Sequence, residues 1–409
     1  MRRPSPWLVL VVLLVGLLIL REPRLNEADD IFLRWLLAHT AASEGPPVPL
    51  TVVEISRDSF ADPNAVIEKP TDKRPAVISP LEFALFLQSV LDFQPKLVAF
   101  ENILKWRDRD KDQEQIFLDQ AMRVPKLLLA AELSTTTDPD APWGDIRGFT
   151  QVTGKRGDLP AFTGVGRQPD EDLRLISAQG FVNLEDASSS RVPLLYMYRG
   201  EVIPSFALQA VMLWLRLTPS EVKVNLGSHI LLPQNRRIPI SSDGTMLIDP
   251  TIAKRARRIS LNEMLLAAQQ RDTGGPAAQQ FNDIRDQIVL ARTPDNPLSP
   301  PDIFASAIAT IQSGAYLHRV SHIFDIVLLL LITTSVAFFH RFERIDLVLC
   351  GIAFTAAYCL LALGCISKWN LWLPAVLPLG LLWLGILVAF FLRTRAESAR
   401  EVAIPPAIA

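Results

Sequence analysis

The chain has 409 residues, a formal net charge of −2 and an apolar fraction of 49%. This near-neutral balance offers no electrostatic attraction for nucleic acid or for an acidic substrate, so we expect no nucleic-acid partner. The mean hydropathy of +0.23 is high for a soluble protein, and the apolar residues concentrate at the two ends of the chain.

The first of these ends is an unbroken apolar run over residues 7–20 with arginines on both sides. At about 1.5 Å per residue it spans roughly 21 Å of a hydrocarbon core near 30 Å, so both a membrane anchor and the apolar region of a signal peptide fit. No small-x-small cleavage pattern follows closely, and the arginines can reach the lipid headgroups. We therefore expect residues 1–24 to form an uncleaved anchor.

The next segments alternate between apolar strands and amphipathic helices. Residues 50–56 (LTVVEIS) have the pattern of a buried strand, and residues 96–100 that of another. Between them Ser79 is a candidate N-cap, and Pro80 fits the first turn of a helix. Strand, capped helix and strand at this spacing predict a βαβ unit with a right-handed crossover. The order recurs in a polar helix over 112–123 and a strand over 126–131, which favours a parallel sheet.

Turn-forming residues are more frequent after this part. Residues 134–172 are rich in Thr, Asp, Pro and Gly, which predicts a long surface excursion. The pair Asp243-Gly244 between apolar residues is typical of a hairpin turn, and Gly314 is a natural residue to end a helix. The remaining elements are predicted strands over 180–184, 192–198, 223–226 and 287–291 and helices over 205–217 and 301–313. The fold class is thus α/β, with a mixed, mostly parallel sheet and crossover helices.

Three further apolar stretches cover residues 323–339, 347–366 and 371–392. Arginine is abundant at 340–344 and after residue 392, whereas the break at 367–370 has a single lysine. By the positive-inside rule, both termini lie in the cytoplasm and the middle domain lies outside. We therefore predict four transmembrane helices, one N-terminal and three C-terminal.

This topology divides the chain into four parts and predicts a multi-pass protein of the bacterial inner (plasma) membrane. All three cysteines, Cys350, Cys359 and Cys365, fall in one apolar stretch, so no disulfide can brace the middle domain. Asp325 lies one turn into the first C-terminal span, where an interfacial position is favoured over a buried relay carboxylate. The parts are the anchor (1–24), an extracytoplasmic sensory domain (25–320), three transmembrane helices (321–392) and a short cytoplasmic tail (393–409).

Catalytic and cofactor motifs are absent from the sequence. The patterns GxxxxGK[ST], GxGxxG, GxSxG, HExxH and paired CxxC do not occur. His318 and His322 have the i, i+4 spacing of a metal pair, but a histidine beside a membrane entry is more often interfacial. We therefore expect no enzyme, no catalytic residues, no metal and no cofactor.

The ends of the predicted strands give the best candidates for a ligand site. Glu54, Glu101 and Glu132 lie at or near three strand ends, and a mixed-charge run over 105–112 follows the second strand. Ligands bind beyond the carboxyl ends of parallel strands, and an acidic cluster there would favour a cationic ligand or a metal ion. The alternatives are that each glutamate pairs with a nearby arginine and that the run is a solvated loop. The predicted ligand-binding residues are Glu54, Glu101, Lys105, Trp106 and Arg107.

Several pieces of the middle domain, in their order of appearance, resemble the second class of CHASE domain, the cyclase/histidine-kinase-associated sensory extracellular module. The resemblance covers about residues 25–320 and includes the flanking spans. It implies an extracytoplasmic sensory domain. The matching pieces are LTVVEIS, PKLVAFENIL, KLLLAAEL, GFVNLEDASSSRVPLLYMYRGEVIPSFALQAV, IPISSDGTMLIDP, DQIVLARTPDN and DIFASAIATIQSGAYL.

Three positions depart from the pattern of that family. Residues 73–77 replace an aromatic and basic stretch, Glu101 stands where an aspartate is usual, and Phe304-Ala305 replaces a His-Ala pair. If these positions form the pocket in relatives, the ligand of this chain is different or absent. Relatives also continue into a cytoplasmic output domain, whereas residues 393–409 are too few to fold alone.

The sequence therefore predicts a membrane-bound signal-input subunit that detects an unknown small molecule or ion, acts through a separate cytoplasmic signalling protein and could form a homodimer. The alternative is a structural or assembly protein of the cell envelope, whose outer domain docks envelope proteins.

Overall fold

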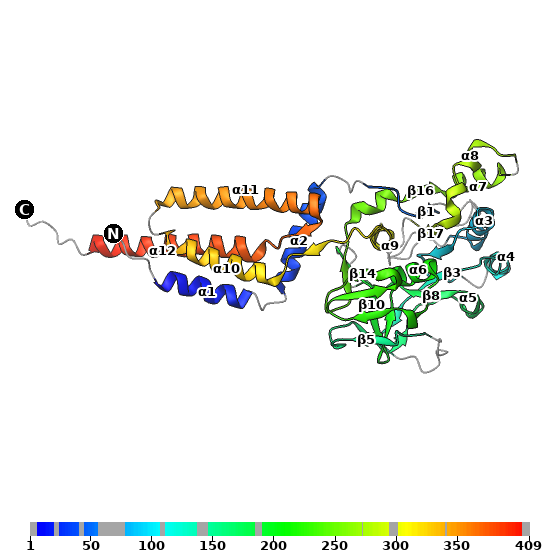
Figure 1. The fold of residues 1–409 in the computed structure, drawn as a ribbon, viewed down its shortest axis with the longest axis horizontal. Helices are drawn as coiled ribbons and strands as arrows, with labels where there is room; N and C mark the ends of the chain where they lie inside the picture. The colour runs from blue at the N-terminus through cyan, green and yellow to red at the C-terminus, as the bar shows by residue number, and fades with distance from the viewer. Residues whose placement is uncertain are drawn as a thin grey trace, which may run out of the picture. The chain divides into compact units, whose positions relative to one another are not determined.

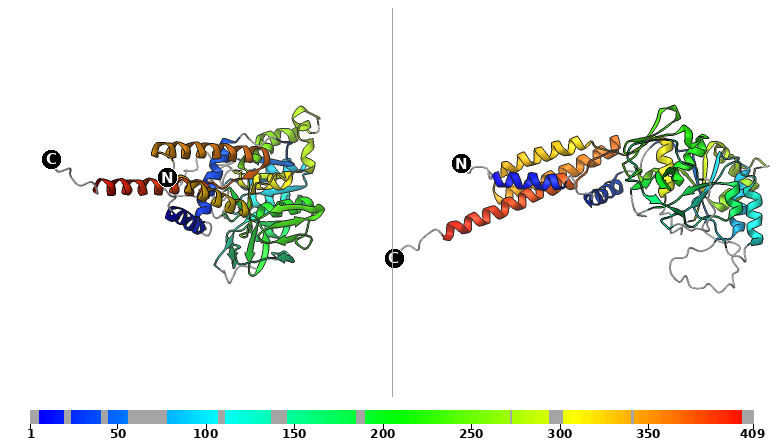
Figure 2. Two further views of the ribbon diagram at one scale, coloured as in Figure 1. Left: turned by 60° about the vertical axis from the view of Figure 1, so that its left-hand side comes forward. Right: turned by 90° about the horizontal axis from the view of Figure 1, so that it is seen from below.

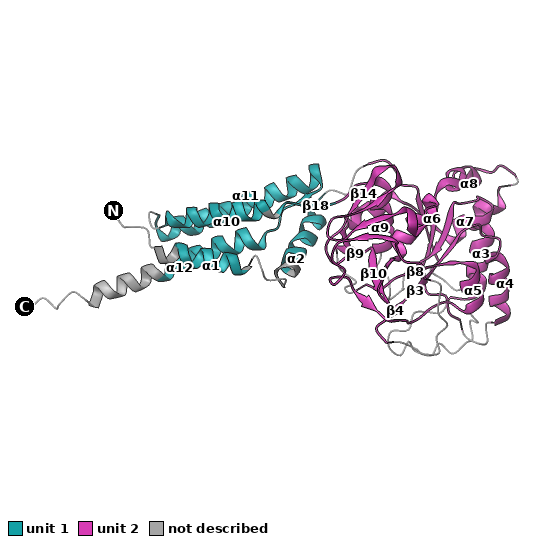
Figure 3. Ribbon diagram, turned by 60° about the horizontal axis from the view of Figure 1, so that its bottom comes forward, with its two compact units in different colours: residues 1–41, 317–409 teal, residues 42–316 magenta. Residues whose placement is uncertain are grey.

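In a computed structural model the chain forms two compact units, coloured separately in Figure 3: residues 1–41 with 317–409, and residues 42–316. The helix α2 (Arg24–His39) and the short strand β18 (His318–Arg319) belong to the first unit. The compact α/β unit is therefore narrower than the sensory domain predicted over 25–320. The structure describes residues 6–19, 24–40, 45–55, 78–106, 111–136, 146–184, 190–271, 273–293, 302–339 and 342–402.

A six-stranded sheet forms the centre of the α/β unit, in the order β16-β1-β17-β2-β3-β8 (Figure 1). All of its neighbouring strands are parallel, where the sequence predicts a mixed, mostly parallel sheet. The short apolar runs form these strands because both faces of the sheet are covered by helices. The bounds are Arg257–Ser260 for β16, Leu50–Glu54 for β1, Ile288–Arg292 for β17, Leu97–Phe100 for β2, Leu127–Ala131 for β3 and Ala178–Phe181 for β8.

The strand β17 lies between β1 and β2, although it comes late in the chain. The predicted βαβ unit is therefore present, but its crossover passes over one strand position. Ser79 caps the crossover helix α3 (Pro80–Leu91) as predicted, accepting a hydrogen bond from the Leu81 backbone N–H at 3.2 Å.

One face of the sheet is covered by α3, α4 (Lys111–Ala121) and α7 (Leu261–Gln269), which share a hydrophobic core with the strands. Aromatic side chains fill much of this core. The Phe100 ring lies edge-on to Phe86 at 5.5 Å and to Phe117 at 5.8 Å between centroids. Two short helices also belong to this part of the chain, α5 (Glu171–Ile176) and α8 (Pro276–Gln279).

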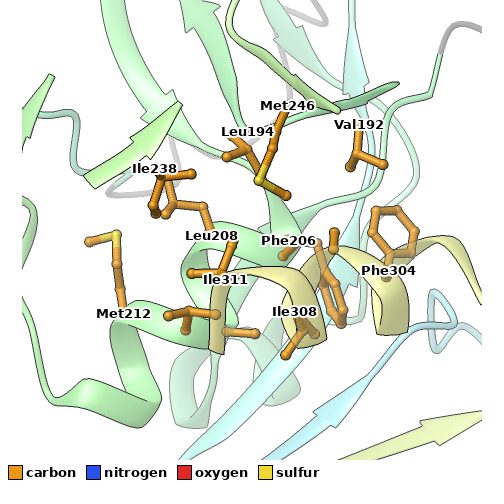
Figure 4. Close-up of a cluster of buried hydrophobic side chains, with 14 of the residues drawn as sticks. Val192, Leu194, Phe206, Leu208, Met212, Ile238, Met246, Phe304, Ile308 and Ile311 are labelled. Carbon is orange, nitrogen blue, oxygen red and sulfur yellow. The ribbon is translucent and has the colours of Figure 1, made fainter. Parts of the chain in front are cut away.

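The opposite face is covered by α6 (Phe206–Leu215) and α9 (Ile303–Ser313), whose apolar side chains meet in Figure 4. The Phe206 and Phe304 rings are fully buried, with centroids 5.3 Å apart. Gly314 ends α9 with a φ of 70°, as the sequence predicts.

Small sheets account for most of the rest, including parts of the predicted surface excursion 134–172. The strands β5 (Gln151–Thr153) and β6 (Ala161–Phe162) join sheets with distant partners, and β7 (Gly164–Val165) pairs with β4 (Leu133–Ser134). Strands of two or three residues have too little alternation to be visible in a sequence. Their partners are β10 (Leu195–Tyr198), β11 (Glu201–Pro204), β12 (Lys223–Asn225), β13 (His229–Leu232) and β14 (Arg236–Pro239).

The hairpin predicted around Asp243-Gly244 is wrong. A turn is present, with Gly244 at a φ of 76°, but the strands on its two sides do not pair with each other. Instead β14 pairs with β13, and β15 (Thr245–Leu247) pairs with β9 (Arg191–Pro193). Tertiary pairing thus overrides the local turn pattern.

The helical unit contains α1 (Pro6–Ile19), α2, α10 (His322–Ala337), α11 (Arg344–Trp369) and α12 (Val376–Val402). Figure 2 shows α1, α10, α11 and α12 running side by side, with α1 packed on α10 and α12. The strand β18 pairs in parallel with β19 (Leu371–Trp372). Among the described residues only α11, with 26 residues, is long and apolar enough to cross a membrane by itself, because the apolar parts of α1, α10 and α12 have 10–17 residues.

Candidate functional site

A pocket of about 450 Å³ lies between the segment that follows β2 and the helices α4 and α5. The four α4 residues that line it are spaced i, i+3, i+4 and i+7, so one face of this helix forms a wall. Two carboxylates come from the start of α5: Asp170 directly precedes the helix and Asp172 lies in its first turn. The lining consists of Lys105, Trp106, Lys111, Glu114, Gln115, Leu118, Asp170, Asp172 and Leu173.

Trp106 is held firmly at the pocket. Its ring nitrogen donates a hydrogen bond to the Ile78 carbonyl at 3.2 Å. The ring also packs against Phe117 at 5.1 Å and Phe83 at 6.0 Å between centroids. An aromatic wall fixed in this way is preorganised for contact with a ligand.

Charged groups of both signs line the pocket. Burial raises the pKa of Glu114 to about 7, helped by a hydrogen bond to Asp170 and by the negative charges of Asp170 and Asp172, while Lys111 opposes the rise. The Glu114 carboxyl therefore holds its proton up to near neutral pH. With two lysines and three carboxyl groups in its lining, the pocket can bind a small cation or zwitterion, and its net charge depends on pH.

The predicted ligand-binding residues fall into three groups. Lys105 and Trp106 line the pocket, whereas Glu54 and Glu101 do not. Arg107 lies outside the residues that the structure describes. Lys111 of α4 belongs to the run 105–112 that the sequence singles out, but the other pocket residues of α4 and those of α5 were not predicted. The i, i+3, i+4 and i+7 spacing of the α4 residues could have indicated that they share one face of a helix. The position of α5 beside α4 depends on tertiary packing, which the sequence pattern does not reveal.

Glu54 belongs to a charged network at the carboxyl edge of the sheet. Arg258 reaches Glu54 at 3.8 Å and Asp302 at 2.6 Å, and the buried Arg292 also binds Asp302. Arg292 is the direct neighbour of Glu54 in the register of β1 and β17. Since Asp302 precedes α9, this network ties three strands to that helix, and Glu54 has an arginine partner.

The other two glutamates do not join Glu54. Glu101 is fully buried, and its backbone N–H donates to the Ala291 carbonyl at 3.1 Å. Glu132 accepts a hydrogen bond from Arg167 at 2.7 Å. Across the described part of the chain, no three His, Cys, Asp or Glu side chains form a group able to hold a metal ion. The predicted convergence of these three carboxylates is therefore not observed.

The helical unit has a second group of charges, where β18 meets α10. Arg319 pairs with the buried carboxylate of Asp325 at 3.3 Å, and its guanidinium lies 5.7 Å from the centre of the Trp372 ring. Asp325 is 2% exposed within this unit, so its carboxylate is buried in an ion pair. His318 lies in β18, so it does not share a helical face with His322, whose side chain is outside the described part.

Comparison with known proteins gives one match. A family model described as the CHASE2 domain matches residues 8–333. No curated protein and no solved structure matches the chain.

Proposed function

The chain belongs to the CHASE2 domain family, a family of extracellular sensory domains, and from this membership we propose that it is a membrane-bound sensor that acts through a separate cytoplasmic signalling protein. The match confirms the resemblance found in the sequence. It also favours a sensory role over a catalytic one.

The proposed topology has four membrane crossings, made by α1, α10, α11 and α12. Support comes from the length of α11 and from the packing of α1 and α12 against α10, with Val12, Leu329 and Leu381 buried among them. Arginines at the ends of the shorter helices can extend their reach to the headgroups. In this topology the α/β unit lies outside the cytoplasm and both termini lie inside.

We assign ligand detection to the pocket lined by Lys105 and Trp106. Arg107 follows directly in the sequence and is included in the proposal, whereas Glu54 and Glu101 lie at strand ends outside this pocket. The mixed charges and the fixed Trp106 ring support a small polar ligand with a positive group.

The observation that carries the proposal is the short connection between the domain core and the membrane helices. The core helix α9 ends at Ser313, β18 begins at His318 and α10 begins at His322. Arg319 of β18 then binds Asp325 of α10. A shift of α9 on ligand binding would therefore reach α10 through only a few residues.

A thermal-shift screen of the full chain in detergent tests ligand detection. A compound that binds only the folded state raises the melting temperature by mass action. We expect small amines or amino acids to do so, and Trp106→Ala to reduce the shift while Trp214→Ala, a substitution away from the pocket, preserves it. A shift that survives Trp106→Ala, or no shift across the screen, would contradict the assignment of this pocket.

Capture of partners separates the sensor from the alternative, an envelope assembly protein. A photo-crosslinker placed at Phe342, between α10 and α11, should recover a kinase, cyclase or regulator from the cytoplasm. Recovery of envelope proteins alone, by crosslinkers on the α/β unit, would favour the assembly role.

A further inference from the structure

The helix α2 has apolar side chains on two sides, an arrangement that a helix on a soluble surface does not need. One side is buried against α11 and α12, with Leu33 and Leu36 fully buried and Leu37 at 5% exposure. On the other side Ile31 is 60% exposed and Trp35 is 42% exposed.

The buried side of α2 is anchored to the start of α12. The Asp29 carboxylate accepts hydrogen bonds from the backbone N–H groups of Ala375 and Val376, both at 2.9 Å. Asp29 therefore satisfies amides at the N-terminus of α12, where its negative charge is favourable. This contact fixes α2 at the end of the bundle where α12 begins, and Figure 1 shows it lying across that end.

The same end of the bundle has side chains of the kind found where a membrane meets water. The helix α11 ends at Trp369, which is 68% exposed, beside Lys368 and Asn370. Tryptophan concentrates where the hydrocarbon meets the headgroups, because its ring is apolar and its N–H is polar. Trp35 of α2 has this chemistry, with Phe32 stacked on it at 5.8 Å and His39 at 4.7 Å.

We propose that α2 lies in the headgroup layer of the membrane, with Ile31 and Trp35 inserted among the lipids. The helix is thus an interfacial anchor between α1 and the α/β unit, and its partner is the lipid surface. The anchoring of its opposite side by Asp29 and the exposed Trp369 at the same end support lipid as the occupant. This inference rests on the proposed membrane insertion of the helical unit.

Spin-label accessibility of the full chain in phosphatidylcholine/phosphatidylglycerol vesicles tests the proposal. Cys350, Cys359 and Cys365 are first replaced by serine, and then Ile31→Cys and Trp35→Cys are labelled one at a time. Collision rates with oxygen, which enters lipid, and with a nickel chelate, which stays in water, are compared. We expect both labels to favour oxygen over the chelate.

Three control positions give the reference values. Leu360→Cys, at an exposed position of α11, reports lipid; Ile116→Cys, exposed on α4, reports water; and Leu33→Cys reports a protein interior. Labels at Ile31 and Trp35 that match Ile116, or that exclude both reagents as Leu33 does, would overturn the proposal. If Leu360 itself matches Ile116, membrane insertion fails; if Leu360 reports lipid and Ile31 reports water, only the inference about α2 fails.

Discussion

Glu114 makes the charge of the candidate pocket sensitive to pH. Its pKa is about 7 in the folded chain, against an ordinary value of 4.5. Between these two values the folded state holds a proton that the unfolded state has lost. The free energy of unfolding therefore falls as the pH rises from about 4.5 to about 7, with the slope set by this difference in bound protons.

Glu114→Gln, which is neutral at every pH, should remove this effect. We expect the variant to lose less stability than the parent between pH 5 and pH 8, by an amount reduced by solvent screening because Glu114 is only half-buried. Melting temperatures of the parent and the variant at pH 5 and pH 8 measure this difference in stability. Asp119→Asn, at an exposed carboxylate of the same helix, is the control, and equal pH dependence in the parent and Glu114→Gln would contradict the raised pKa of Glu114.

Removing Arg319 should destabilise the helical unit. Arg319→Ala leaves the charge of Asp325 in a buried position, which typically costs about 3–5 kcal/mol for a fully buried pair and less here because Arg319 is 29% exposed. Denaturant unfolding in detergent measures the loss. Adding Asp325→Asn removes the buried charge and should restore part of it, whereas additive losses in the double variant would show that the two groups are not coupled.

Some individual residues of the candidate site could be predicted from the sequence. Lys105 and Trp106 were identifiable because they follow a predicted strand, and strand ends are where ligands bind. Asp170 could not be identified in this way, because its position beside Glu114 depends on how the segment before α5 packs against α4. Glu54 looked equally suitable, but the strand order brings Arg258 and Arg292 beside it.

The packing of α6 on the sheet depends on a close approach at Gly180. A Cβ atom at this position would lie 2.8 Å from a Phe206 ring carbon and 3.0 Å from the Phe206 Cα. The backbone of α6 therefore has to move if the residue is larger. Glycine in this strand is required by the helix above it.

Gly180→Ala should cost about 1–3 kcal/mol, as overpacking of a core does. Gly157→Ala is the matched control, because a Cβ there meets nothing within 4 Å, and it should change the free energy of unfolding by less than about 0.5 kcal/mol. Chemical denaturation of both variants measures the difference. A similar small loss in both would contradict the close approach of α6.

The sequence predicted the helices and strands that are long enough for a regular spacing of apolar residues to be recognised. The strands β1, β2, β3 and β17 and the helices α3, α4, α6 and α9 are recognisable from their apolar runs, from Ser79 as a cap and from Gly314 as an end. The insertion of β17 between β1 and β2 could not be predicted, because strand order depends on contacts between residues that are distant in sequence. The helix α2 was also missed, since its polar residues made it look like the start of the domain.

The proposed function of the whole molecule depends on which side of the membrane holds the α/β unit. Composition identified the apolar helices, because hydrocarbon-spanning segments differ from all others in hydropathy. Arginine bias predicts the orientation, and the family match supports an extracellular role. The sensory role, the cytoplasmic partner and the interfacial position of α2 all presuppose this arrangement.

Reporter insertions at two positions of the full chain test on which side of the membrane the α/β unit lies. Gly200 lies in an exposed turn between β10 and β11, and Phe342 lies between α10 and α11. If the α/β unit lies outside the cytoplasm, alkaline phosphatase is active and green fluorescent protein is dark at Gly200, and the reverse holds at Phe342. Silent phosphatase and bright fluorescence at Gly200 would place the α/β unit in the cytoplasm and overturn the proposed sensor.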